Sequence, residues 1–117
     1  MKPYFSATIL LLGATLSSQS ALAAPVYLSC SINNGEKDIG IELTADESNS
    51  IVTVMVQGGR APQRLNGQFS AGRVVFGDRL VVYTLDRSTL DLVRSVPGMG
   101  WTDRGSCKVE KVGRRAF

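Results

Sequence analysis

The sequence predicts an all-β domain: a small antiparallel meander that closes into a barrel of seven or eight short strands. Apolar and polar residues alternate with a period of two over most of the chain, which is typical of strands with one buried face. Turn signals rich in Gly, Asn, Asp and Pro separate these short segments. Two cysteines lie near the two ends of the strand-rich region. A two-sheet β-sandwich is the alternative fold that fits the same pattern.

The first 23 residues read as a secretory signal peptide. Lys2 precedes an apolar stretch over residues 7–16, and Ala21-Leu22-Ala23 provides a small-residue cleavage site. The stretch is too short for a transmembrane helix, which needs about 20 residues. We therefore expect cleavage after Ala23, no transmembrane segment, and a single domain over residues 24–117 that is periplasmic or secreted.

The strands follow from the alternation in order. The first ends at Asn33-Asn34-Gly35, a strong hairpin signal. In the second, Ile39, Ile41 and Leu43 share one face, and the seventh is marked by Leu90 and Leu92. Residues 97–104 are expected as a loop. The expected strands cover residues 26–32, 39–44, 51–57, 63–69, 73–76, 79–85, 89–94 and 106–112.

Cys30 and Cys107 are expected to form a disulfide, because an even pair of cysteines in a small exported domain is most simply a bridge. The bridge would tie the first strand to the last. Closing a loop of this length stabilises the fold by about 4.5 kcal/mol in the chain-entropy model. Barrel closure would also remove the unpaired edges of an open sheet.

The composition argues against an enzyme. The chain has no His, which excludes Ser-His-Asp and Cys-His nucleophile sites and His-zinc sites. Asp46, Ser48 and Ser50 alternate as calcium ligands sometimes do, but the glycine and the distal glutamate of such a loop are missing. We expect a non-catalytic protein with no cofactor and no metal. Nucleic acid is not expected as a partner, because the aromatic residues fall mostly on strands where a core needs them.

Three groups of residues are candidates for binding. Trp101 lies close to Met99 and Arg104, and Trp, Met and Arg are enriched in protein interfaces. The alternative, which we favour, is that Trp101 is buried and plugs one end of the barrel. Arg60 and Arg64 flank Pro62 in a Gly-rich loop. The third group is the basic C-terminal region: Lys108, Lys111, Arg114 and Arg115.

The charge is distributed unevenly behind a formal net charge of +3. Residues 24–59 hold one basic and five acidic residues, whereas residues 60–117 hold eleven basic and five acidic ones. Solvated outer faces of strands account for such a distribution. A second function class nevertheless follows from it: an accessory or stress protein that binds an anionic polysaccharide or a lipid surface.

Tyr27-Leu28-Ser29-Cys30 near the start of the predicted domain and Gly105-Ser106-Cys107-Lys108 near its end enclose a Gly-punctuated run of short strands. This layout resembles the small periplasmic inhibitors of c-type lysozyme. The resemblance implies an antiparallel barrel tied by a disulfide between its first and last strands. The inhibitory loop of that family is typically Ser-Gly-Ala-Arg-Tyr. The nearest stretch here is residues 69–74, which supplies Ser70 and Arg73 in a different order and without the Tyr.

The leading functional hypothesis is therefore a non-catalytic exported barrel that binds a partner, most simply a protein, in the bacterial cell envelope through its loops. Inhibition of a c-type lysozyme is its most concrete form.

Overall fold

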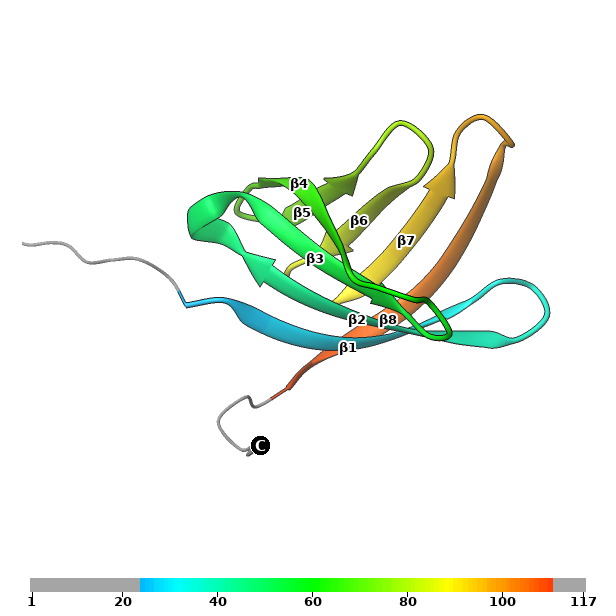
Figure 1. Ribbon diagram of the computed structural model, residues 1–117, viewed down its shortest axis with the longest axis horizontal. Coiled ribbons are helices and arrows are strands. Elements are labelled where there is room, and N and C mark those ends of the chain that lie inside the picture. Colours follow the sequence, from blue (N-terminus) through cyan, green and yellow to red (C-terminus); the bar gives the residue numbers. More distant parts are fainter. Residues whose placement is uncertain (1–23, 111–117) are drawn as a thin grey trace, which may run out of the picture.

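The computed structural model describes residues 24–110 and contains eight antiparallel strands (Figure 1). Within residues 24–110, a short turn joins each strand to the next, and the turn between the second and third strands contains the 3-10 turn Glu47–Asn49. The strands are β1 (Val26–Asn33), β2 (Asp38–Asp46), β3 (Ile51–Val56), β4 (Gln63–Phe69), β5 (Arg73–Gly77), β6 (Val82–Asp86), β7 (Asp91–Val96) and β8 (Trp101–Glu110).

The strands form a closed ring in chain order, so the predicted barrel is confirmed and the sandwich alternative is wrong. Each strand pairs with the next, and β1 also pairs with β8, in a register that runs from Tyr27 opposite Glu110 to Asn33 opposite Arg104. The long blue strand β1 and the orange-red strand β8 are antiparallel neighbours along this seam (Figure 1).

The seam is closed covalently by the predicted Cys30–Cys107 disulfide, whose two residues lie directly opposite each other in the ladder. Gly105 lies two residues before Cys107 and faces Ile32. A Cβ atom at Gly105 would run into the carbonyl oxygen of Ser31 and come within 2.6 Å of the Ile32 Cα. Glycine is therefore required here, because the backbones of β1 and β8 approach too closely for any side chain.

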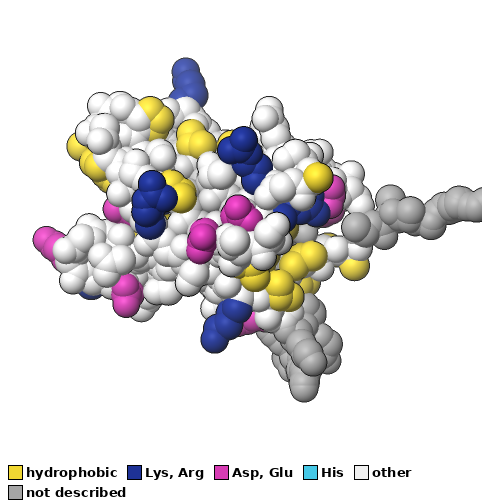
Figure 2. Space-filling model, turned by 180° about the vertical axis from the view of Figure 1, so that it is seen from behind, with side chains coloured by type: hydrophobic (Ala, Val, Ile, Leu, Met, Phe, Trp, Pro, Cys, Tyr) yellow, Lys and Arg dark blue, Asp and Glu magenta, His cyan; other side chains and the backbone are white. Residues whose placement is uncertain are grey.

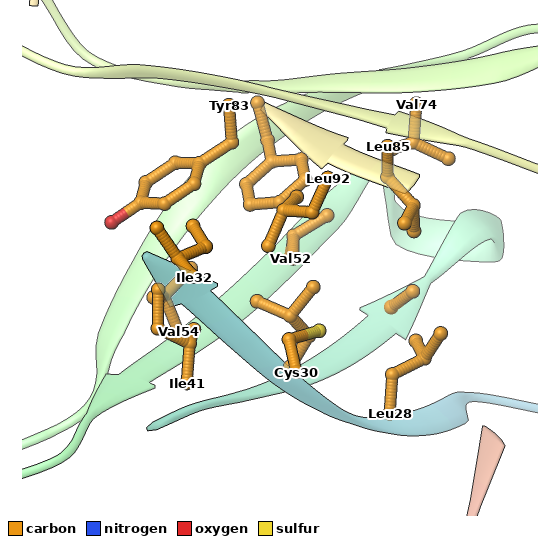
Figure 3. Close-up of a cluster of buried hydrophobic side chains, with 13 residues drawn as sticks. Leu28, Cys30, Ile32, Ile41, Val52, Val54, Val74, Tyr83, Leu85 and Leu92 are labelled. Atoms are coloured by element: carbon orange, nitrogen blue, oxygen red, sulfur yellow. The ribbon is translucent and has the colours of Figure 1, made fainter. Parts of the chain in front are cut away.

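The core fills the interior of the barrel with alternate side chains from opposite walls (Figure 3). Ile32, Ile41 and Leu92 are fully buried. The rings of Phe76 and Tyr83 stack with their centroids 5.0 Å apart. The burial of these apolar side chains is the main stabilising contribution to a small domain. The alternation in the sequence predicts which residues are buried.

Two predicted strand starts are wrong by three residues or more, both after turns, whereas the other predicted bounds differ from the structure by two residues at most. The sixth strand starts at Val82 rather than residue 79, because the Asp78 carboxylate accepts hydrogen bonds from the backbone N–H groups of Leu80 and Val81 and holds a turn there. The last strand starts at Trp101 rather than residue 106. The N–H groups of Met99 and Gly100 donate to the Val96 carbonyl and reverse the chain within four residues, so Trp101 pairs directly with Val96.

The turns divide the molecule into two ends. The turns over residues 34–37, 57–62, 78–81 and 97–100 lie at the end that we call the Trp101 end. The turns over residues 47–50, 70–72 and 87–90 lie at the other, which we call the Arg87 end. In Figure 1 the Trp101 end is on the right and the Arg87 end is on the left.

The predicted signal peptide and the basic residues Lys111, Arg114 and Arg115 lie outside the described residues. Between residues 24 and 110, no helix is long and apolar enough to cross a membrane.

Candidate functional site

Trp101 lies at one end of the barrel, as the favoured interpretation has it, but it is not buried. Trp101 is the first residue of β8, and its side chain is 41% exposed. The prediction that it is a buried plug is therefore wrong. Its place in the alternation of β8 gives it the same orientation as Asp103, toward the barrel axis. Because the strand begins here, the indole lies at the mouth of the barrel rather than among the core side chains.

An ion pair inside the mouth holds Trp101 in place. Arg94 of β7 lies opposite Asp103 of β8, and its Nη2 and Nε atoms donate to Asp103 Oδ2 at 2.6 and 3.2 Å. Both side chains are largely buried, at 14% and 8% exposure. The same guanidinium lies 5.7 Å from the centroid of the Trp101 ring, a cation–π contact. Three side chains from two neighbouring strands therefore fix one another.

Sequence analysis missed Arg94 and Asp103, although the signal was present. Leu92 is a core position, and a period of two places Arg94 on the same inward face. Cys107 faces inward because of the disulfide, and the same period through Gly105 reaches Asp103. Charged residues at inward positions of two strands are expected to be paired, since an unpaired buried charge is costly. The missing information was that β7 and β8 are neighbours in this register.

A groove of about 780 Å³ opens beside Trp101. One wall is formed by residues 33–36, where β1 turns into β2, and the other by residues 101–104 of β8 together with Arg94. We call this the Trp101 groove. Its size lies within the range of about 300–1,000 Å³ that is typical of ligand sites. Its lining mixes an aromatic ring with charged and neutral polar groups.

Exposed apolar residues also occupy two turns at the Trp101 end. Leu80 is 72% exposed and Met99 is 69% exposed, in the turns that precede β6 and β8. Because β6, β7 and β8 are consecutive strands, both turns lie at the same end as Trp101. Figure 2 shows this end at the left of the view, where hydrophobic, basic and acidic side chains lie beside one another.

The structure does not bring the predicted arginines together. Arg60 lies in the turn over residues 57–62 and Arg64 on the outer face of β4, whereas Arg104 is on the outer face of β8. In a ring of eight strands, β4 and β8 lie on opposite sides. Lys108 is exposed on the outer face of β8, nearer to the Arg87 end. A contiguous cationic patch is therefore not formed by these four residues.

Ser70 and Arg73 lie at the opposite end from Trp101, in the exposed turn between β4 and β5. The N–H and Oγ of Ser70 both donate to the Arg73 carbonyl, at 2.9 and 3.0 Å. Arg87 donates from Nη1 to the Ser70 carbonyl at 2.6 Å and pairs through Nη2 with Glu47 Oε1 at 2.9 Å. The turn is thus well ordered, and it shares no surface with the Trp101 groove.

Two turn carboxylates have altered titration, one at each end. The Asp78 carboxylate accepts hydrogen bonds from the N–H groups of Val81 and Leu80, which lowers its pKa. The N–H groups of Thr89 and Ser88 lower the pKa of Asp86 in the same way. Asp78 is exposed and Asp86 is partly buried, and both carboxylates stay ionised at neutral pH, so they shape turns and do not act as acids.

No His, Cys, Asp or Glu side chains gather in threes or more around a point where a metal could bind, as far as residues 24–110 are concerned. Asp46 instead caps the 3-10 turn, where its carboxylate accepts hydrogen bonds from the backbone and side-chain nitrogens of Asn49. Asp46 therefore has a structural role in this turn.

Comparison with protein-family models, with characterised proteins and with solved structures found no match to this chain.

Proposed function

We propose that the protein is a non-catalytic, exported binding protein of the bacterial cell envelope, and that the Trp101 end recognises its partner. The observation that carries this proposal is a half-exposed tryptophan, fixed by a buried ion pair, on the wall of a groove of about 780 Å³. The disulfide across the barrel seam is compatible with the oxidising compartment that the predicted signal peptide implies.

The arrangement favours binding because it keeps an apolar ring in water. An arginine buried beside an aspartate must be desolvated, and the pair then supports a large side chain that is not itself buried. Such a ring gains apolar contact only when a partner covers it. Leu80 and Met99 add two further exposed apolar side chains at the same end of the barrel, and apolar side chains of this kind are typical of binding surfaces.

Trp101 is also the natural reporter, because it is the only tryptophan in the chain. Residues 24–117 are titrated with periplasmic protein, purified cell-wall fragments and vesicles of anionic lipid, and the emission of Trp101 is recorded. We expect one fraction to shift the emission to shorter wavelength. Thr102→Arg, which places a bulky side chain in the groove wall, should abolish the shift, whereas Arg73→Ala at the opposite end should retain it. Absence of a shift with every fraction, or a shift that survives Thr102→Arg, contradicts the proposal.

Inhibition of a c-type lysozyme is the second candidate, and it would use the Arg87 end. The observation in its favour is the ordered, exposed turn that presents Ser70 and Arg73 together. Residues 24–117 should then slow the lysis of cell-wall substrate by c-type lysozyme, and the double variant Ser70→Ala, Arg73→Ala should lose potency while Thr102→Arg keeps it. No inhibition at a large molar excess of protein would remove this candidate.

A further inference from the structure

The donor and acceptor groups of the Trp101 groove point to one chemical class of ligand. We infer that the groove binds a neutral glycan chain, with one sugar ring stacked on the indole of Trp101 and its hydroxyl groups bound by the polar side chains of the two walls. This inference rests on the proposed function and names the chemistry of the partner.

The charges that line the groove cancel. Arg94 is neutralised by Asp103 at 2.6 Å. The two remaining charged residues are Arg104 on one wall and Glu36 on the other. A polyanion would be attracted by Arg104 and repelled by Glu36, and a cation would be attracted by Glu36 and repelled by Arg104. An uncharged ligand avoids both penalties.

The polar side chains of the walls are free to bind hydroxyl groups. Among the described residues, the structure gives no intramolecular hydrogen bond to the side chains of Glu36, Thr102 or Arg104. Asn34 uses its Oδ1 to accept from the N–H groups of Glu36 and Lys37, which fixes the turn and leaves its amide N–H groups for a ligand. A sugar hydroxyl both donates and accepts, so it suits walls that offer a carboxylate beside a guanidinium, an amide and a hydroxyl.

The indole supplies the apolar part of the site. Sugar rings present C–H groups on their faces, and a flat aromatic ring offers these groups apolar contact area. Arg94 contacts Trp101 from within the barrel at 5.7 Å, and such a contact reduces the side-chain entropy that the indole loses on binding. The ring is nevertheless 41% exposed, which leaves surface for a ligand to cover.

The test uses chitotetraose, a neutral tetramer of N-acetylglucosamine, with tetragalacturonate as an anionic probe of equal length. Binding to residues 24–117 is measured by titration calorimetry. We expect chitotetraose to bind with a Kd of about 1 mM or tighter. Raising the salt concentration to 0.5 M should change this affinity by less than about twofold, since no net charge is paired. Tetragalacturonate should bind more weakly.

Tyr27→Ala is the matched control for Trp101→Ala. Tyr27 is an aromatic residue of similar exposure, 38% against 41%, on the outer face of β1 toward the Arg87 end. Trp101→Ala should weaken the binding of chitotetraose about tenfold or more, which corresponds to roughly 1.4 kcal/mol of lost contact. Tyr27→Ala should leave it within about twofold, and circular dichroism checks that both variants fold.

Each other outcome overturns the inference. Tighter, salt-sensitive binding of tetragalacturonate identifies an anion site instead. Equal losses in the two variants place the glycan outside the groove. If neither sugar binds while a protein fraction or vesicles shift the emission of Trp101, the glycan is excluded but the proposed function stands. If nothing shifts that emission, both fail.

Discussion

The two ends of the barrel each carry an arginine–carboxylate pair next to an aromatic ring, and the two pairs differ in what surrounds them. At the Arg87 end, Arg87 and Glu47 are exposed at 34% and 46%, and Arg87 lies over Phe69 at 5.9 Å. At the Trp101 end, Arg94 and Asp103 are buried and Trp101 is exposed. At the Arg87 end the charged pair is exposed to solvent, whereas at the Trp101 end the aromatic ring is exposed.

This difference separates a structural role from the proposed binding role. The exposed pair joins the turns over residues 47–50 and 87–90, and its residues help to line an apolar cavity of about 180 Å³ together with Phe69 and Leu90. That pair covers the core and ties turns together. The buried pair instead supports a ring that the fold itself does not cover. The Arg87 end thus closes the fold, and the proposed function gives recognition to the Trp101 end.

The largest expected effect comes from removing the disulfide, which joins β1 to β8 and supports both ends of the barrel. Cys107→Ser opens the bridge between β1 and β8 and should lower the free energy of unfolding by about 4.5 kcal/mol, the chain-entropy value for a loop of 77 residues. Urea unfolding followed by circular dichroism measures this loss. An unchanged melting temperature under reducing conditions would show that the seam does not depend on the disulfide.

Breaking the buried pair should have the next largest effect. Arg94→Met leaves the Asp103 carboxylate buried without its partner and should cost about 3 kcal/mol in urea unfolding. The double variant Arg94→Met, Asp103→Leu removes both charges and should recover most of that stability. The emission of Trp101 should still move to longer wavelength in the double variant, because the guanidinium that holds the ring is gone. Unchanged emission would refute the positioning role of Arg94.

The exposed pair should matter much less. Arg87→Ala removes the contacts to Glu47 and to the Ser70 carbonyl, and at this exposure it should cost below about 1 kcal/mol. Salt should weaken this contribution, since the pair is open to solvent. Urea unfolding at low and high salt provides the measurement. A loss equal to that of Arg94→Met would erase the contrast between the two ends.

The smallest expected effect is a pH dependence that the two ends share. The pKa values of Asp78 and Asp86 are lowered in the folded protein, so each group adds stability above its unfolded pKa, about 4, and loses it as the pH falls through the lower folded value. Asp78→Asn and Asp86→Asn keep an oxygen acceptor for the turn but remove the titration. Each should flatten the loss of stability below about pH 4 in thermal unfolding. A slope unchanged in both variants would contradict this assignment.

The alternation of residues predicted the strands and the core, because a period of two is a local property that survives into the structure. The disulfide was predicted from the even pair of cysteines in a small exported domain, and the closed barrel from the many short strands together with that disulfide. The turn boundaries at Asp78 and at residues 97–100 depend on hydrogen bonds between specific backbone groups, which alternation does not encode. The site was harder to predict. Trp101 was recognised, but its exposure depends on where β8 begins. Arg94 and Asp103 become a pair only through the register of β7 with β8. Ser70 and Arg73 lie at the other end because the β4–β5 turn falls there.

Amide hydrogen exchange, with and without the envelope fraction that shifts the emission of Trp101, is the most direct test of the assignment of recognition to one end. Protection by a bound partner should slow exchange in residues 33–36 and 97–104 and leave residues 70–73 and 86–90 unchanged. Slowing at residues 70–73 and 86–90, with none beside Trp101, would contradict the account and assign recognition to the Arg87 end.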